Sequence, residues 1–162
     1  MPETLLTQEA ITGSEQITDL RDPLQALAEF YRALNSRDLV LMEANWDNGN
    51  DAAIDNPLGG IKRGWPEIRA VYEGLFHTDG DFRFEFYDYT LHRFQEIFYV
   101  VGRERGYLRT RGNNLEMRIR TTRVFRFDGR RWRQVHHHGS VEDPQLLRAY
   151  QTAVLGAANS SS

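Results

Sequence analysis

The segment of residues 115–127 constrains the fold most, because apolar and polar side chains alternate along its whole length. A period of two is typical of a β-strand that buries one face. The odd-numbered positions carry Leu115, Met117, Ile119, Thr121, Arg123, Phe125 and Phe127. We therefore predict a long strand whose odd-numbered face is buried, and this places one charged residue, Arg123, among apolar neighbours.

Arg123 is the residue from which the sequence says most about function. A buried guanidinium group costs free energy unless it is paired or hydrogen-bonded. Two interpretations follow. Either an internal carboxylate such as Asp55 or Asp47 pairs with Arg123, or Arg123 binds an anionic ligand.

The hydrophobic pattern changes from helical to strand-like at Asp81. Asp22-Pro23 and Asp38 mark the starts of two helices before that residue. The other expected helices cover residues 64–77 and 144–156, and the expected strands cover 52–60, 82–94, 96–110, 115–127 and 131–141. Helices followed by a strand meander indicate an α+β fold, with helices packed on one face of a curved antiparallel sheet. We expect an N-terminal arm at residues 1–20, one domain at 21–156 and a disordered tail at 157–162.

Composition excludes several classes of protein. The 162 residues contain no cysteine, so disulfides, thiolate metal sites and cysteine nucleophiles are excluded. No apolar run approaches the roughly 20 residues that a membrane span needs. The N-terminal stretch lacks the basic and apolar regions of a signal peptide. We predict a cytoplasmic protein without a membrane partner.

Charge is distributed unevenly along the chain. Residues 1–60 hold eleven acids and three arginines, whereas residues 103–133 hold eleven arginines and three acids. This asymmetry is typical either of a nucleic-acid surface or of a strand ladder whose arginines pair with acids on helices or on a partner subunit. Lys62 is the only lysine, and arginine suits planar pairing with carboxylates. Since no nucleic-acid motif is present, we predict no nucleic-acid partner.

Three consecutive histidines, His136 to His138, lie near the C-terminus. Strand alternation puts His137 on one face and its two neighbours on the other. A three-residue hairpin loop would place His137 across from Thr121, facing inward, whereas a two-residue loop would turn His136 and His138 inward. No third metal ligand lies at a suitable spacing, so we predict neither a metal site nor a cofactor.

Three stretches, RALNSRDL, AIDNPLGG and TTRVFRFDGRRWRQVHHHGS, resemble the nuclear-transport-factor-two-like superfamily. Within it the chain is similar to the SnoaL-like group, to ketosteroid isomerases and to the association domain of calmodulin-dependent protein kinases. The resemblance covers residues 22–155. It implies a cone, a cystatin-like α+β barrel in which helices wrap a curved sheet around one pocket, and a homodimer formed through the outer sheet face.

The resemblance to ketosteroid isomerases does not extend to their catalytic groups. Their catalytic aspartate before the proline corresponds to Asn56, and an amide cannot act as a general base. Their oxyanion-binding tyrosine corresponds to Phe30, with Tyr31 one position away, and their protonated aspartate corresponds to Arg123. Typical ketosteroid isomerase chemistry is therefore not expected.

The resemblance to the kinase association domain retains more of the pocket. Its Thr-Arg-Val corresponds to Thr122-Arg123-Val124, and a second pocket arginine corresponds to Arg103. This similarity implies a small carboxylate held between the two guanidinium groups. The match at Gly139, where that family has a third arginine, favours the arrangement in which His137 faces inward.

Two functional hypotheses result. The first is a homodimeric small-molecule-binding domain, its ligand a small carboxylate or a polar–apolar metabolite. The second is a SnoaL-like lyase, cyclase or isomerase without a redox cofactor, in which Arg123 stabilises developing charge. A purely structural assembly module is the third possibility. The expected catalytic residues are His137, Asn56 and Tyr31, and the expected ligand-binding residues are Arg123, Arg103, Trp46 and Tyr72.

Overall fold

A computed structural model describes residues 8–156 of the chain, as four helices and six strands. The helices are α1 (Pro23–Ser36), α2 (Leu39–Asn45), α3 (Trp65–Phe76) and α4 (Pro144–Leu155). The strands are β1 (Ala53–Asp55), β2 (Lys62–Arg63), β3 (Asp81–Phe94), β4 (Ile97–Thr110), β5 (Asn113–Phe127) and β6 (Trp132–Ser140). The predicted α+β fold is confirmed. The sequence did not indicate β2, which has only two residues, both exposed.

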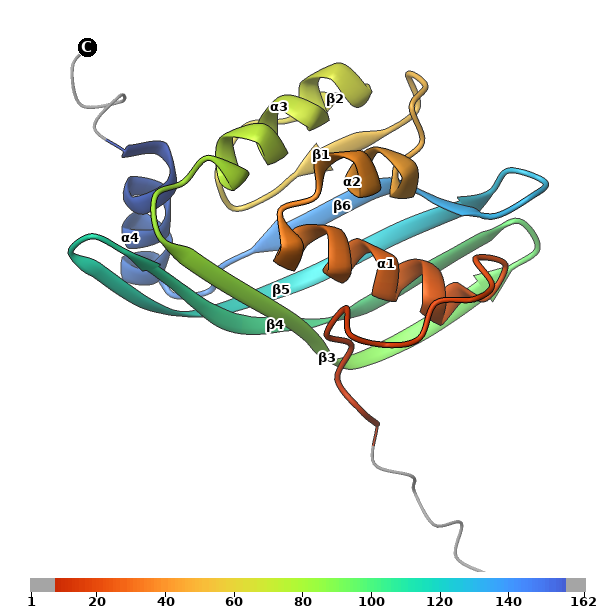
Figure 1. Ribbon diagram of the computed structural model, residues 1–162, viewed down its shortest axis with the longest axis horizontal. Helices are drawn as coiled ribbons and strands as arrows, with labels where there is room; N and C mark the ends of the chain where they lie inside the picture. Colours follow the sequence, from red (N-terminus) through yellow and green to blue (C-terminus); the bar gives the residue numbers. More distant parts are fainter. Residues whose placement is uncertain (1–7, 157–162) are drawn as a thin grey trace, which may run out of the picture.

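All six strands form one sheet in the order β2-β1-β6-β5-β4-β3. Neighbouring strands are antiparallel, except that β1 runs parallel to β6. Helices α1, α2 and α3 lie over one face of the curved sheet, and α4 lies at one end of it (Figure 1). The core fills the space between the helices and the concave sheet face.

Side-chain caps fix where three helices begin. Asp22 accepts a hydrogen bond from the Leu24 N–H, with Pro23 at the first helical position, and Asp38 accepts from the Leu41 N–H. Asp143 caps α4 by accepting from the Gln145 N–H. Each cap satisfies a backbone donor that the helix itself leaves unpaired. The predicted helix starts at Asp22 and Asp38 are therefore correct.

The alternation that defines β5 is borne out by burial. Its buried residues are Met117, Ile119, Thr121, Arg123 and Phe125. The intervening arginines, Arg118 and Arg120, are exposed on the outer face. β5 therefore separates an apolar interior from a charged outer surface.

The described part of the expected N-terminal arm, residues 8–20, contains no helix. Ile11 is buried and exchanges backbone hydrogen bonds of 2.8 and 2.9 Å with Phe86 of β3. Gly13 has a φ of +88°, and a Cβ there would lie 2.5 Å from the backbone nitrogen of Arg32. Glycine is therefore required where this segment crosses α1. The rest of the arm and the predicted tail, residues 1–7 and 157–162, lie outside the described residues.

Between residues 8 and 156, no helix combines the length and the apolar composition that crossing a bilayer requires.

Candidate functional site

Arg123 is paired inside the core, but not with either of the acids we expected. Its Nη2 lies 2.8 Å from Oε1 of Glu104 on β4, and the side chains of the two residues are 2% and 5% exposed. The predictions of Asp55 and Asp47 are wrong, because Asp55 faces outward beside two histidines and Asp47 pairs with Arg126. Arg123 therefore meets an internal carboxylate.

The alternation of β4 could have identified Glu104 as that partner. The even-numbered positions Phe98, Val100 and Leu108 are buried, so Glu104 shares their inward face. In the sheet, Glu104 pairs with Ile119 of β5. Gly102 and Gly106 interrupt the apolar pattern of the strand and weaken this signal.

Two aromatic residues of α1 complete the surroundings of the buried ion pair. The Tyr31 hydroxyl donates to Glu104 Oε1 over 2.8 Å, and the guanidinium carbon of Arg123 lies 3.6 Å from the centre of the Phe30 ring. Burial and the nearby Glu104 raise the pKa of Tyr31 well above its usual value. Although burial alone would lower it, Tyr31 and Glu104 raise the pKa of Arg123. Arg123 is thus permanently charged and internally neutralised.

A chain of polar groups continues from Arg123 through the core. Arg123 Nη1 donates to Gln134 over 2.7 Å, and Gln134 donates to Asn45 over 3.2 Å. Asn45 donates to Glu29 over 3.0 Å, and Glu29 pairs with Arg131 at the base of the β5–β6 hairpin. Each charged side chain in this series of polar groups has an opposite charge at hydrogen-bond distance. Arg123 therefore needs no ligand to be satisfied.

His137 faces the interior because β6 contains a β-bulge. Phe125 pairs with Gln134, but the next pairs are Val124 with His136 and Arg123 with His137, so Val135 is an extra residue. The bulge lets Gln134 and His137 both point inward although their numbers differ in parity. The expected pairing of His137 with Thr121 is wrong, since Thr121 pairs with Gly139.

Both ring nitrogens of His137 are buried and have no hydrogen-bond partner among residues 8–156. Burial lowers the pKa of His137 well below its usual value, and the charge of Arg123 lowers it further. The ring is therefore neutral at pH 7, with one nitrogen able to donate and the other able to accept. Because buried polar atoms are nearly always paired, this ring marks a place where a partner fits.

A cavity of about 40 Å³ lies beside His137. Its wall includes four of the predicted site residues: Arg123, His137, Asn56 and Tyr72. Burial raises the pKa of Tyr72 to about 12, so its hydroxyl stays protonated at neutral pH. Asn56 Oδ1 accepts a hydrogen bond from the Leu58 N–H. The group that Asn56 can offer to a ligand is therefore its NH₂ group, which is a donor. Beside the ion pair of Arg123 and Glu104, the wall therefore presents the uncharged Tyr72 and Asn56 and the neutral imidazole of His137.

Three predicted site residues do not line this cavity. The Tyr31 hydroxyl donates to Glu104, and Glu104 rather than Tyr31 lines the cavity. Trp46 is fully buried in the core, with its ring centre 6.2 Å from that of Tyr72. Arg103 lies on the outer face of the sheet, half exposed, and pairs with Asp88 at 3.3 Å. Because Glu104 points inward, strand alternation turns its neighbour Arg103 outward. No carboxylate can therefore bridge Arg103 and Arg123.

A family model for the SnoaL-like domain matches residues 24–144. The chain belongs to this SnoaL-like family. The F-box protein SKIP8 of Arabidopsis thaliana is 25% identical to the chain over 149 residues, which are 88% of this chain and 62% of that protein. The chain thus spans less than two thirds of this curated relative.

Solved structures share the fold of this SnoaL-like domain. A candidate calcium/calmodulin-dependent protein kinase type II association domain from Thiobacillus denitrificans is 25% identical, has a TM-score of 0.69, and is matched over 78% of this chain and 99% of its own. A candidate dehydratase of the NTF2-like family from Streptomyces avermitilis is 18% identical, has a TM-score of 0.65, and is matched over 73% of this chain and 93% of its own. The predicted SnoaL-like group is thus confirmed by the family model, and the predicted fold of the nuclear-transport-factor-two-like superfamily is confirmed by these structures.

His136 and His138 lie on the outer face of the SnoaL-like domain, on either side of Asp55. His136 Nε2 is 3.6 Å and His138 Nδ1 is 3.4 Å from the Asp55 carboxylate. Among residues 8–156, no three His, Cys, Asp or Glu side chains are grouped so that they could hold a metal ion. The outer histidines therefore belong to the surface and His137 to the interior.

Proposed function

We propose that this SnoaL-like domain binds a small organic molecule whose uncharged polar group enters the cavity beside His137. The observation that carries the proposal is the pair of buried, unpartnered nitrogens of His137 on the wall of that cavity. Since Glu104 neutralises Arg123, the cavity offers no net positive charge to a ligand. A hydroxyl, carbonyl or amide group suits this site better than a carboxylate does.

Thermal-shift measurements with small ketones, lactones, amides and phenols test this proposal. We expect a ligand that stabilises the wild type to stabilise His138→Leu equally and His137→Leu not at all. His138 is the matched control because it lies one residue away on the same strand but on the outer face. A ligand that stabilises His137→Leu as strongly as the wild type would exclude His137 from the binding site.

A second candidate function is a lyase or isomerase reaction in which His137 acts as general base. The neutral ring of His137 has a nitrogen that can accept a proton, and the resemblance to a candidate dehydratase is consistent with this function. Asn56 would orient the substrate, and Tyr31 would act only by holding Glu104. We expect exchange of solvent deuterium into the carbon next to a bound ketone, lost in His137→Gln. Binding without exchange would favour the first function.

We also propose that the domain forms a homodimer through the outer sheet face. That face carries Val101, which is 44% exposed. The likeness to a kinase association domain supports self-assembly. The cytoplasmic location stays a prediction.

A further inference from the structure

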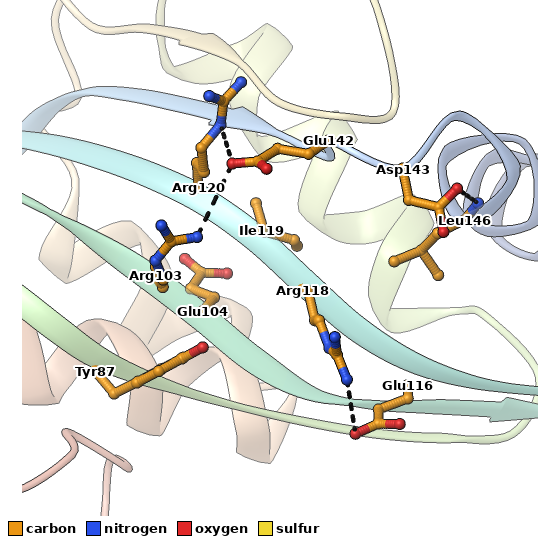
Figure 2. A pocket seen from close by; sticks show the side chains of 10 residues that line it. All are labelled: Tyr87, Arg103, Glu104, Glu116, Arg118, Ile119, Arg120, Glu142, Asp143 and Leu146. Atoms are coloured by element: carbon orange, nitrogen blue, oxygen red, sulfur yellow. Dashed lines mark hydrogen bonds and ion pairs between the residues drawn. The ribbon is translucent and has the colours of Figure 1, made fainter.

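A second hollow lies where β6 ends. Ser140, the last residue of β6, pairs with Arg120, and residues 113–119 of β5 pair with β4 alone. Residues 141–143 form the link between β6 and α4. A cleft of about 410 Å³ lies between this link and the side of β5 that β6 leaves uncovered. Figure 2 shows its lining residues, which come from β3, β4, β5, the link and α4.

The cleft and the buried cavity are neighbours. Glu104 and Ile119 line both of them. Helix α4 contributes to both as well, because Leu146 lines the cleft and Tyr150 lines the cavity. Residues four apart lie on the same helix face, so one face of α4 extends from the cleft to the cavity. Ile119, only 7% exposed, stands between the two hollows.

The cleft already holds a carboxylate of the chain itself. Glu142 Oε1 lies 3.1 Å from Arg120 Nε and 3.9 Å from Arg103 Nη1 (Figure 2). The side chains of all three residues are at least half exposed: Glu142 by 57%, Arg120 by 58% and Arg103 by 50%. Ion pairs this exposed contribute at most about 1 kcal/mol, so a ligand carboxylate can replace Glu142. Arg118 is 75% exposed, and its partner Glu116 is 3.7 Å away.

We infer that this cleft is the entrance to the buried cavity, and that Arg103 and Arg120 bind the carboxylate of an entering molecule in place of Glu142. The inference rests on the proposed function, and it names the ligand class. The carboxylate stays among the arginines, while an uncharged polar group passes Ile119 to reach His137. Hydroxy and oxo carboxylic acids fit this description.

Cysteine labelling tests the entrance without any ligand, because the chain has no cysteine of its own. In His137→Cys the introduced thiol lies on the cavity wall, and uncharged methyl methanethiosulfonate is the probe. We expect the added substitution Ile119→Phe to abolish most of the labelling rate, and the added substitution Leu75→Phe to leave the rate unchanged. Both add a phenyl ring to the cavity wall, but only Ile119 also borders the cleft. Equal rates in the two double variants would overturn the entrance.

A second thiol tests the selection of charge. In Ile119→Cys, we compare the labelling rates of a sulfonate-bearing and a trimethylammonium-bearing methanethiosulfonate, each divided by its rate with Val40→Cys, an exposed reference. In Ile119→Cys/Glu142→Gln, where Arg103 and Arg120 lack the carboxylate of Glu142, we expect the sulfonate to be favoured about tenfold, since fields of this kind change encounter rates by 10-fold or more. The preference should be smaller when Glu142 is present, and it should disappear when Arg103→Gln and Arg120→Gln are added. No preference in Ile119→Cys/Glu142→Gln would overturn the binding of a carboxylate by these arginines.

The two proposals fail separately. If Ile119→Phe slows the labelling but no ligand loses its thermal shift in His137→Leu, the entrance stands and the proposed binding function is wrong. If a ligand loses its thermal shift in His137→Leu but Ile119→Phe leaves the labelling rate unchanged, the binding function stands and this inference is wrong. Circular dichroism of each variant verifies that the labelled protein is folded.

Discussion

Arg123 and His137 are paired directly across β5 and β6, yet only one of them has its hydrogen-bonding partners. Arg123 is hydrogen-bonded to Glu104 and Gln134, whereas neither nitrogen of His137 has a hydrogen-bond partner within the described part of the chain. Two adjacent polar residues on one buried face thus differ in role. The first is satisfied within the fold, and the second is the group that we propose a ligand contacts.

Replacing Glu104 with glutamine should destabilise the domain by about 3–5 kcal/mol, because it leaves the charge of Arg123 buried without a counter-charge. Urea unfolding of the variant and the wild type measures the difference. The double variant Arg123→Met/Glu104→Met should recover most of this loss, since well-packed apolar side chains can replace a buried ion pair. A loss below 1 kcal/mol in Glu104→Gln would mean that water reaches Arg123.

Replacing His137 with leucine should stabilise the domain by about 1–3 kcal/mol, since two unpaired buried polar atoms are removed. The same unfolding measurement applies. His138→Leu is the control and should change stability by less than about 0.5 kcal/mol, as surface substitutions usually do. A destabilised His137→Leu would show that the histidine is already satisfied by ordered water.

The stability of the wild type should fall as the pH decreases below about 6.5, the ordinary pKa of histidine. The pKa of His137 is lowered in the folded state, so below that pH the unfolded chain binds a proton that the folded chain does not. The slope for one such group is about 1.4 kcal/mol per pH unit. We expect the stability gap between His137→Leu and the wild type to widen between pH 7 and pH 5 and to be constant above pH 7. A gap independent of pH would contradict the assignment of a neutral buried ring.

Replacing Val101 with glutamate should dissociate the proposed dimer. Val101 lies between Thr90 and Thr122 on the outer face, so the substitution leaves the core untouched. Light scattering coupled to size exclusion should report a dimer for the wild type and a monomer for the variant. A monomeric wild type at the highest soluble concentration would reject the dimer.

Much of this architecture could be predicted from local patterns. The alternation of β5 identified Arg123 as buried, and Asp22 and Asp38 marked two helix starts. The register of β6 could not be predicted, because a bulge at Val135 has no signature in a strand without glycine at that point. The position of Arg103 was inferred from a resemblance, whereas the alternation of β4 would have placed it correctly.

The chain of side chains between Arg123 and Glu29 has a direction. At each step the group nearer Arg123 donates: Arg123 to Gln134, Gln134 to Asn45, and Asn45 to Glu29. The two amide dipoles therefore align head to tail between a cation and an anion, and neither amide can rotate by 180° without turning an NH₂ group toward a donor. An isosteric change from amide to carboxylate at either position would thus break the sequence of donors, although it would alter neither the volume nor the shape of the core.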